Sequence, residues 1–382
     1  MSPSQSLQPG SASILFHFAD LDDPRVMRTR QHKLIDIIVI AICGVICGSE
    51  SWVEIEKYGK SKRDWLGTLL ELPNGIPSHD TFGRVFAQLD PRQFHECFGR
   101  WIATLHSVTA GRLIPIDGKT ARHSFDRAAG KGPLHLVSAW AANNHLVLGQ
   151  VAVSEKSNEI TAIPELLRLL DLHGAIVTID AMGCQKEIAK QIIAGGGDYV
   201  LAVKGNQEKL QEAVLGLCEQ SMENDFKDIK HTRYETEEKS HGRFEQRTYY
   251  ALEVPAHFAG QEAWQKLKSV CMAIRICKEA GQEETCRARY YISSLPADAK
   301  TLGEAIRSHW GIENSCHWVL DVSFREDESR IRKDHGPANM GLLRRLAVSL
   351  LKQATFMKGG IHAKRLQAGW DDDNLQKVLV GS

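Results

Sequence analysis

Two short apolar segments, each ending in an aspartate, carry the clearest chemical signal in this chain. Residues 113–117 read Leu-Ile-Pro-Ile-Asp, and residues 175–180 read Ala-Ile-Val-Thr-Ile-Asp. Such runs predict buried strands, and carboxylates that follow these strands point into the crevice where α/β sheets bind ligands. Asp117 and Asp180 therefore predict a site for a divalent cation such as Mg2+ or Mn2+, which prefers oxygen ligands.

A two-metal site for phosphoryl transfer needs a third carboxylate, and Glu313 is the preferred candidate. Two ions about 4 Å apart can activate an attacking oxygen and stabilise a leaving oxygen. Glu313 lies in a predicted helix with Arg307 nearby, and its face also carries an aromatic ring and two imidazoles: His309, Trp310 and His317. Three further carboxylates downstream are rivals for the third position: Asp321, Glu326 and Asp327.

Each of these residues, taken alone, has an ordinary explanation. Asp117 precedes Gly118 and suits a turn, while Asp180 suits the N-cap of a helix that begins near Cys184,. Single histidines on a helix are more often packing groups than ligands, and a tryptophan is more often part of a core. The combination of the three carboxylates is what favours catalysis.

Composition excludes few classes of protein. The 382 residues carry 47 basic and 47 acidic side chains, so no overall charge points to a nucleic-acid partner,. A local excess exists between Arg325 and Arg365, with ten Lys/Arg against four Asp/Glu, which suits either DNA phosphates or a solvated helical face,. The nine cysteines include no CxxC pair and predict buried thiols in a reducing cytoplasm,. The apolar run 37–47 is shorter than the roughly 20 residues of a membrane span and predicts a core helix,.

The periodicity changes along the chain and predicts its organisation. Residues 1–12 are expected to be disordered, and residues 13–108 to form a helical N-terminal domain, with Ser78 as one N-cap,. The following β-β-β-α-β-α-β order predicts an α/β fold with a mixed sheet that matches a ribonuclease H-like core. This catalytic domain spans 109–360 with a β-rich insertion at about 206–294, and 361–382 form a C-terminal tail. Helical periodicity runs from Thr301 to about Lys358, with one break near 335–337.

Several longer motifs resemble one known family across nearly the whole chain. They occur in order at 75–82 (GIPSHDTF), 116–119 (IDGK), 155–160 (EKSNEI), 178–185 (TIDAMGCQ), 204–207 (KGNQ), 241–243 (HGR) and 309–314 (HWGIEN). Together they are similar to the DDE transposases of bacterial insertion sequences, of the H-repeat-associated (ISAs-type) group.

The resemblance implies a ribonuclease H-like catalytic domain with a β-strand insertion and a triad of Asp117, Asp180 and Glu313 holding two Mg2+ or Mn2+ ions. It implies cleavage at the ends of the element and strand transfer into target DNA, by a homodimer that holds two terminal inverted repeats in the cytoplasm at the nucleoid. A broader relative group places Tyr, Arg and Lys around the glutamate. Here those positions hold Ile306, His309 and Leu320.

Other polar residues in the motifs are candidates for DNA contact. Lys119 and Lys204 can meet phosphates as point charges, and Asn206 and Gln207 can meet phosphates or base edges. The remaining candidates come from the insertion and from the helix of Glu313: His241, Arg243, Arg307, His309, Trp310 and His317. A plain turn, a surface strand of alternating charge and an ordinary helix face are the competing explanations.

Three other functions remain open. A nuclease of the same fold would cut without joining, and a domesticated, inactive transposase would only bind DNA. A glycosidase would use two carboxylates as acid and base without metal, although aromatic residues are only 7% of the chain.

Overall fold

The computed structural model describes residues 14–105, 113–125, 132–142, 145–153, 158–240, 242–279 and 283–380. The chain divides into two compact units, and β1 (Leu113–Ala121) passes from one to the other. The first unit combines residues 1–109, 118–156 and 313–382, and the second combines residues 110–117 and 157–312. The predicted disorder of residues 1–12 lies outside the described residues.

The first unit is mainly helical and is built around the buried helix α12 (Gly336–Gln353). Its N-terminal elements are α1 (Ile14–Phe18), η1 (Met27–Thr29), α2 (Leu34–Ile46), α3 (Trp52–Ser61), α4 (Arg63–Leu66), α5 (His79–Gln88) and α6 (Pro91–Leu105). Its C-terminal elements are the turn η4 (Glu313–His317), α11 (Trp318–Phe324), η5 (Glu326–Glu328), α12 (Gly336–Gln353), α13 (Ile361–Trp370) and α14 (Asp372–Val380). α12 packs against α2, α5, α6 and the hairpin of β2 (Leu134–Ala141) and β3 (Leu146–Val153).

The sequence accounts for much of this unit. The apolar run 37–46 is buried on every side within α2, as the pattern predicts. Ser78 caps α5 by accepting a hydrogen bond from the Thr81 N–H, at 3.4 Å. The segment called a tail forms α13 and α14, which pack on each other and on α12. Within the described residues, no helix combines the length and the apolar character that crossing a membrane requires.

One expectation about the C-terminal helices is wrong. The predicted helix from residue 301 to the break near 335 is interrupted much earlier. α10 (Ala299–Ile312) leads into a π-helical turn at 313–317, and α11 ends at Phe324 because Arg325 adopts a left-handed conformation with φ of 47°. A non-glycine residue with positive φ costs energy, and no residue-type signal at Arg325 announces it.

The second unit contains a mixed sheet with strand order β1-β4-β5-β9-β8-β7-β6. β1, β4 (Ile176–Ile179) and β5 (Asp198–Val203) run parallel, with α7 (Glu159–Arg168) and α8 (Lys186–Ala194) between them in sequence. After η2 (Gly205–Gln207) and α9 (Glu208–Glu223) come the antiparallel strands β6 (His231–Ser240), β7 (Arg243–Glu253), β8 (Ser269–Glu279) and β9 (Thr285–Ser293), with η3 (Gln261–Ala263) before β8. The α/β class and the mixed sheet are as predicted.

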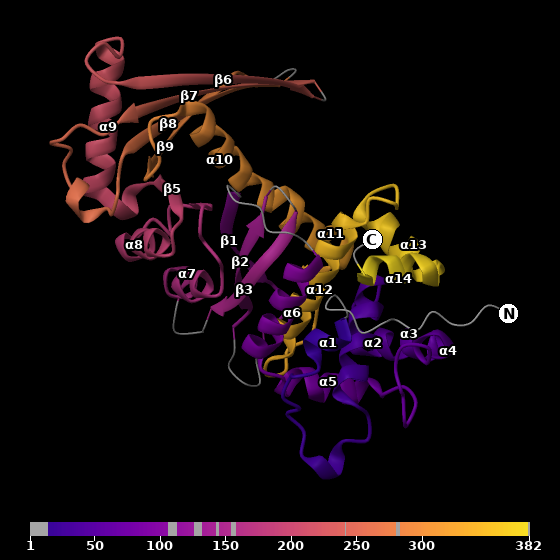
Figure 1. Cartoon of the computed structure of the whole chain (residues 1–382). Helices are drawn as coiled ribbons and strands as arrows, with labels where there is room; N and C mark the ends of the chain where they lie inside the picture. Colours follow the sequence, from indigo (N-terminus) through magenta and orange to yellow (C-terminus); the bar gives the residue numbers. More distant parts are fainter. Residues whose placement is uncertain are drawn as a thin grey trace. The chain divides into compact units, whose positions relative to one another are not determined.

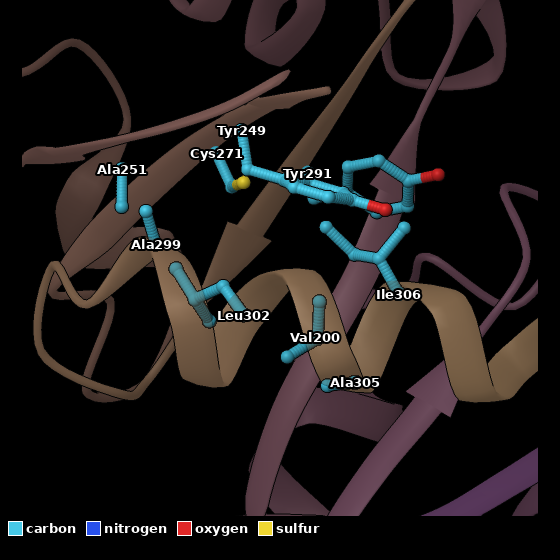
Figure 2. Close-up of a cluster of buried hydrophobic side chains, with 9 residues drawn as sticks. All are labelled: Val200, Tyr249, Ala251, Cys271, Tyr291, Ala299, Leu302, Ala305 and Ile306. Atoms are coloured by element: carbon cyan, nitrogen blue, oxygen red, sulfur yellow. The ribbon is translucent and has the colours of Figure 1, made fainter. Parts of the chain in front are cut away.

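α10 packs across this sheet and contacts both its parallel and its antiparallel strands (Figure 1). Figure 2 shows the apolar contact, in which Leu302 and Ile306 of α10 face the rings of Tyr249 and Tyr291. A Cβ added to Gly303 would lie 2.9 Å from the Tyr249 ring, so glycine permits this close approach. The packing fixes the C-terminal end of α10, where His309 and Trp310 lie.

Candidate active site

Asp117 and Asp180 follow directly on paired positions of two neighbouring parallel strands. In the β1–β4 register, Ile116 lies opposite Ile179, so the next residue on each strand is an aspartate. Because adjacent strands are about 4.8 Å apart, the two side chains leave the sheet at one edge, next to each other. Both residues are partly buried. The register therefore places the two aspartates at the ends of adjacent strands, an arrangement that suits ligands of one cation or of a pair,.

The loop after Asp180 is held in place by its own backbone. Asp180 Oδ1 accepts hydrogen bonds from the Met182 N–H at 3.0 Å and the Gly183 N–H at 3.4 Å. Both of these bonds go to Oδ1. A Cβ on Gly183 would lie 2.2 Å from Ile179 Cγ2 and 2.9 Å from Ile163 Cδ1, so the tight turn requires glycine here.

The turn after β5 supports the same loop. The Asn206 side-chain amide donates to the Ala181 carbonyl at 2.6 Å. The Gln207 amide donates to the Cys184 carbonyl at 3.0 Å and to Gln185 Oε1 at 3.2 Å. These two residues, predicted to contact DNA, thus use their amide donors on the Asp180 loop, whereas Lys204 is exposed at the start of the turn.

His309 of α10 lies beside β4 and close to Asp180. Its Nδ1 is 3.2 Å from the hydroxyl of Thr178. Burial lowers the pKa of the His309 imidazole, although the nearby Asp180 carboxylate opposes this shift. Trp310 is partly exposed, and its ring lies under the Arg289 guanidinium, 4.4 Å from its centroid. Arg307 pairs with Glu238 of β6 at 3.2 Å.

In the first unit, Glu313 begins the π-helical turn and its carboxylate is 3.3 Å from the Nδ1 atom of His317. Short π-helical turns are frequent at functional sites. The Glu313 side chain is 60% exposed, whereas that of His317 is buried. Glu313 therefore presents a carboxylate that a histidine supports and solvent reaches.

The rival carboxylates are each engaged by cationic side chains of the same unit. Asp321 lies 2.7 Å from the Lys119 ammonium, and Asp327 pairs with Arg122 at 3.2 Å. Burial raises the pKa of Asp321, and Lys119 opposes that shift. Glu326 is fully buried; burial alone would raise its pKa, but the guanidinium groups of Arg345 and Arg344 outweigh burial and lower it.

The remaining sequence candidates are placed as follows. Lys119 is largely buried in its ion pairs with Asp321 and Asp327. Arg243 lies at the start of β7 beside Glu245, and His241 lies outside the described residues. The basic excess of 325–365 is partly internal, because four of its ten cations are buried: Arg344, Arg345, Lys364 and Arg365.

Sequence reasoning missed the residues that support the site. Thr178 precedes Asp180 by two positions and so projects from the same face of β4. A polar residue in an otherwise apolar strand was the available signal. Arg289, which lies over Trp310, belongs to an alternating pattern in β9 that was not used.

These features define an α/β protein with paired strand-end carboxylates suited to a hard divalent cation. The chain belongs to the DDE transposase family, since the model of the transposase DDE domain matches residues 109–350 and that of the DDE_Tnp_1-associated domain matches residues 15–102.

Relatives in Escherichia coli agree with this assignment. The chain is 43% identical over 371 residues to the "Putative transposase YncI" of strain O157:H7, covering 96% of this chain and 94% of that protein. It is 41% identical over 373 residues to the "H repeat-associated putative transposase YhhI" of strain K12, covering 97% and 98%. A shorter K12 relative, "H repeat-associated putative transposase YbfD", is 44% identical over 242 residues, covering 63% of this chain and 94% of that protein.

Proposed function

We propose that this protein cleaves DNA at the ends of an insertion sequence and joins the freed 3′ ends to target DNA, in a reaction that depends on Mg2+ or Mn2+. The observation that carries the proposal is the register of β1 and β4, which sets Asp117 and Asp180 at one edge of the sheet. The family assignment supplies DNA as the substrate.

In this proposal, three carboxylates bind the metal: those of Asp117, Asp180 and Glu313. Asp117 and Asp180 would hold the metal from neighbouring strands, and Glu313 would complete the ligand set. Glu313 is preferred over Asp321, Glu326 and Asp327 because those three already neutralise cationic side chains. Bound Mg2+ would supply charge stabilisation at phosphorus and activate the attacking oxygen.

The protein groups around Asp180 contribute orientation. The Met182 and Gly183 N–H groups fix one carboxylate oxygen, and Asn206 and Gln207 hold the loop that carries these N–H groups. Preorganised ligands of this kind add to rate because the site does not reorganise during the reaction. Lys204 remains a candidate for direct phosphate contact, and so do Arg243, Arg307 and Trp310.

The wider organisation follows from the reaction. The helical segment 13–108 would recognise the terminal inverted repeats, and two protomers would bring two ends together as a homodimer on DNA. The catalytic domain would span 109–360 with its insertion at about 206–294, and the protein would work at the nucleoid in the cytoplasm.

The direct test uses labelled duplexes that carry the terminal repeats found on either side of the gene. With Mg2+, the wild-type protein should yield cleaved ends and joined product, and chelation with EDTA should stop both. Asp117→Asn, Asp180→Asn and Glu313→Gln should each abolish cleavage while leaving binding of the ends intact. Glu253→Gln removes an exposed carboxylate of β7 that pairs with Lys230 and serves as the matched control.

The outcomes separate the competing functions. Cleavage without joining would assign a nuclease, and binding without cleavage would assign an inactive DNA-binding derivative. Full activity of the Glu313→Gln protein would show that another carboxylate completes the site and would direct attention to Asp321 or Glu326.

A further inference from the structure

One face of the inserted strands carries a concentration of arginines, of which only Arg243 belongs to the sequence motifs. In antiparallel pairs, directly opposed residues project to the same side. Arg247 of β7 lies opposite Arg275 of β8, and Arg275 lies opposite Arg287 of β9. Three guanidinium-bearing side chains therefore form a row across three adjacent strands, each about 4.8 Å from the next.

Two more arginines extend this row on the same side. Arg243 precedes Arg247 by four positions in β7, and Arg289 follows Arg287 by two positions in β9, and both even steps return to the same face,. We call these five residues the arginine face: Arg243, Arg247, Arg275, Arg287 and Arg289. The chain as a whole has no net charge, so this excess is local and is not a by-product of a basic composition.

α10 covers the apolar part of the same side of the sheet, next to the arginine face. Tyr249, Ala251, Cys271 and Tyr291 lie on the same side of β7–β9 and form an apolar core with Ala299, Leu302 and Ile306 (Figure 2). After Ile306, α10 presents polar residues: Arg307 reaches Glu238, and Trp310 lies under Arg289. The apolar half of the face is thus packed by the protein itself, and the arginine face begins where that packing ends.

A single buried carboxylate organises the arginines and does not neutralise them all. Glu245 is 5% exposed, and it accepts a bidentate contact from Arg275, at 2.7 Å from Nε and 3.1 Å from Nη2. Arg243 and Arg247 also pair with it. Three cations share this one acid. Two further acids contact the row, since Glu279 lies 3.6 Å from Arg243 and Glu238 lies 3.3 Å from Arg247.

The cations at the other end of the row face solvent. Arg287 and Arg289 are both exposed, and the Arg275 side chain is 38% exposed. Like charges placed directly opposite each other destabilise a sheet, so the row costs stability in the isolated protein. A polyanion removes that cost, and guanidinium groups match phosphate oxygens in bidentate geometry.

We propose that the arginine face binds the phosphate backbone of duplex DNA, with Arg275, Arg287 and Arg289 as the contacting residues and Glu245 as the residue that positions Arg275. The inference rests on the proposed function, which supplies DNA as the substrate, and it adds residues that the sequence motifs did not mark. Backbone contacts of this kind fix the DNA without reading its bases.

The test measures affinity of the full-length protein for a duplex of arbitrary sequence across a salt series. The logarithm of the binding constant falls linearly with the logarithm of the salt concentration. Removing two phosphate contacts should make this negative slope shallower by about 1.8, since each contact contributes about 0.9. The double variant Arg275→Gln/Arg287→Gln should therefore bind more weakly and with the smaller slope. Lys278→Gln is the matched control, because Lys278 is an exposed cation of β8 that projects to the opposite face,.

Each outcome decides the matter. Unchanged affinity and slope in the double variant, with DNA binding by the wild type, would overturn the arginine face and leave the proposed function standing. Failure of the wild type to bind DNA would overturn both. Equal competition by polyglutamate would assign the face to an acidic protein partner instead. The single variant Arg287→Gln keeps the test open if the double variant does not fold, and its slope should fall by about 0.9.

Discussion

The buried ion pair between Arg345 and Glu326 gives the sharpest prediction about stability. Arg345 Nη1 lies 2.8 Å from Glu326 Oε1, and the two side chains are 0% and 1% exposed. Arg345 also donates to Ser138 of β2 and to the Gly341 carbonyl. Removing one partner of a buried pair leaves an uncompensated charge, which costs roughly 3–5 kcal/mol. Arg345→Met should therefore lower the free energy of unfolding by that amount.

A double-mutant cycle separates this cost from simple loss of packing. Glu326→Leu alone should be destabilising for the same reason, because it strands the Arg345 cation. The double variant Arg345→Met/Glu326→Leu strands neither, so its loss should be well below the sum of the two single losses. The remaining loss of stability in the double variant has two sources. The Arg345 hydrogen bonds to Ser138 and to the Gly341 carbonyl are removed, and the buried Arg344, whose pKa burial lowers, loses a nearby carboxylate.

The sign of the pH dependence follows from the direction of the Glu326 shift. The pKa of Glu326 is lowered in the folded protein, so its contribution to stability is present above the unfolded value of about 4.3 and is lost as the pH falls below it,. In Arg345→Met, burial dominates and raises this pKa, so acid favours the folded variant. The stability gap between wild type and variant should therefore narrow as the pH falls through about 4.3.

Urea denaturation followed by far-UV circular dichroism at pH 7 and pH 4 measures these quantities. Lys60→Met, which breaks an exposed pair with Glu56, is the control and should not move the transition,. Two results contradict the reasoning: additive losses in the double variant, or a gap that widens in acid. Either result would show that compensation of the Glu326 charge is not the source of the stability that Arg345 contributes.

Four further predictions concern other parts of the molecule. Gly183→Ala should cost about 1–3 kcal/mol and reduce cleavage, because the added Cβ meets Ile179 at 2.2 Å,; thermal unfolding and the cleavage assay report both effects. Ser78→Ala should cost about 1 kcal/mol through loss of the α5 cap, measurable in urea,. Burial raises the pKa of Glu245, but its three arginine partners outweigh burial and lower the pKa to about 2. The Glu245 carboxylate should therefore stabilise the protein above about pH 4.3, and this stabilisation should be lost in acid. Glu245→Gln should flatten this part of the curve of stability against pH. Asn206→Ala should reduce the cleavage rate without changing the dissociation constant for DNA, since its amide binds the Ala181 carbonyl.

The sequence predicted elements well where one local signal sufficed. β5 was expected at 198–203 and has those bounds, because a short apolar run between polar turns leaves little choice. α2 and the Ser78 cap follow from equally local patterns. The interruption after Phe324 could not be predicted, because the left-handed Arg325 obeys no residue preference and is fixed by the surrounding packing.

Pairings between distant residues were also beyond reach. Lys119 was expected at the mouth of a phosphate site, yet it is paired with Asp321, about two hundred positions later in the chain. A solitary lysine next to a predicted catalytic aspartate looks the same in sequence whether it faces substrate or an acid. Only the register and the packing of the first unit distinguish the two roles.

The KGNQ motif illustrates how one short string can contain two functions. The sequence favours DNA contact for Lys204, Asn206 and Gln207, with a plain turn as the alternative, because all three are polar and follow a strand. In the structure, the Asn206 and Gln207 amides donate hydrogen bonds to the loop that carries Asp180, while Lys204 is exposed. An amide hydrogen that already donates to a backbone carbonyl at 2.6 Å must break that bond to meet DNA, and breaking it would release the loop that carries Asp180,. The motif therefore couples two requirements, a held carboxylate and a nearby cation, in four consecutive residues.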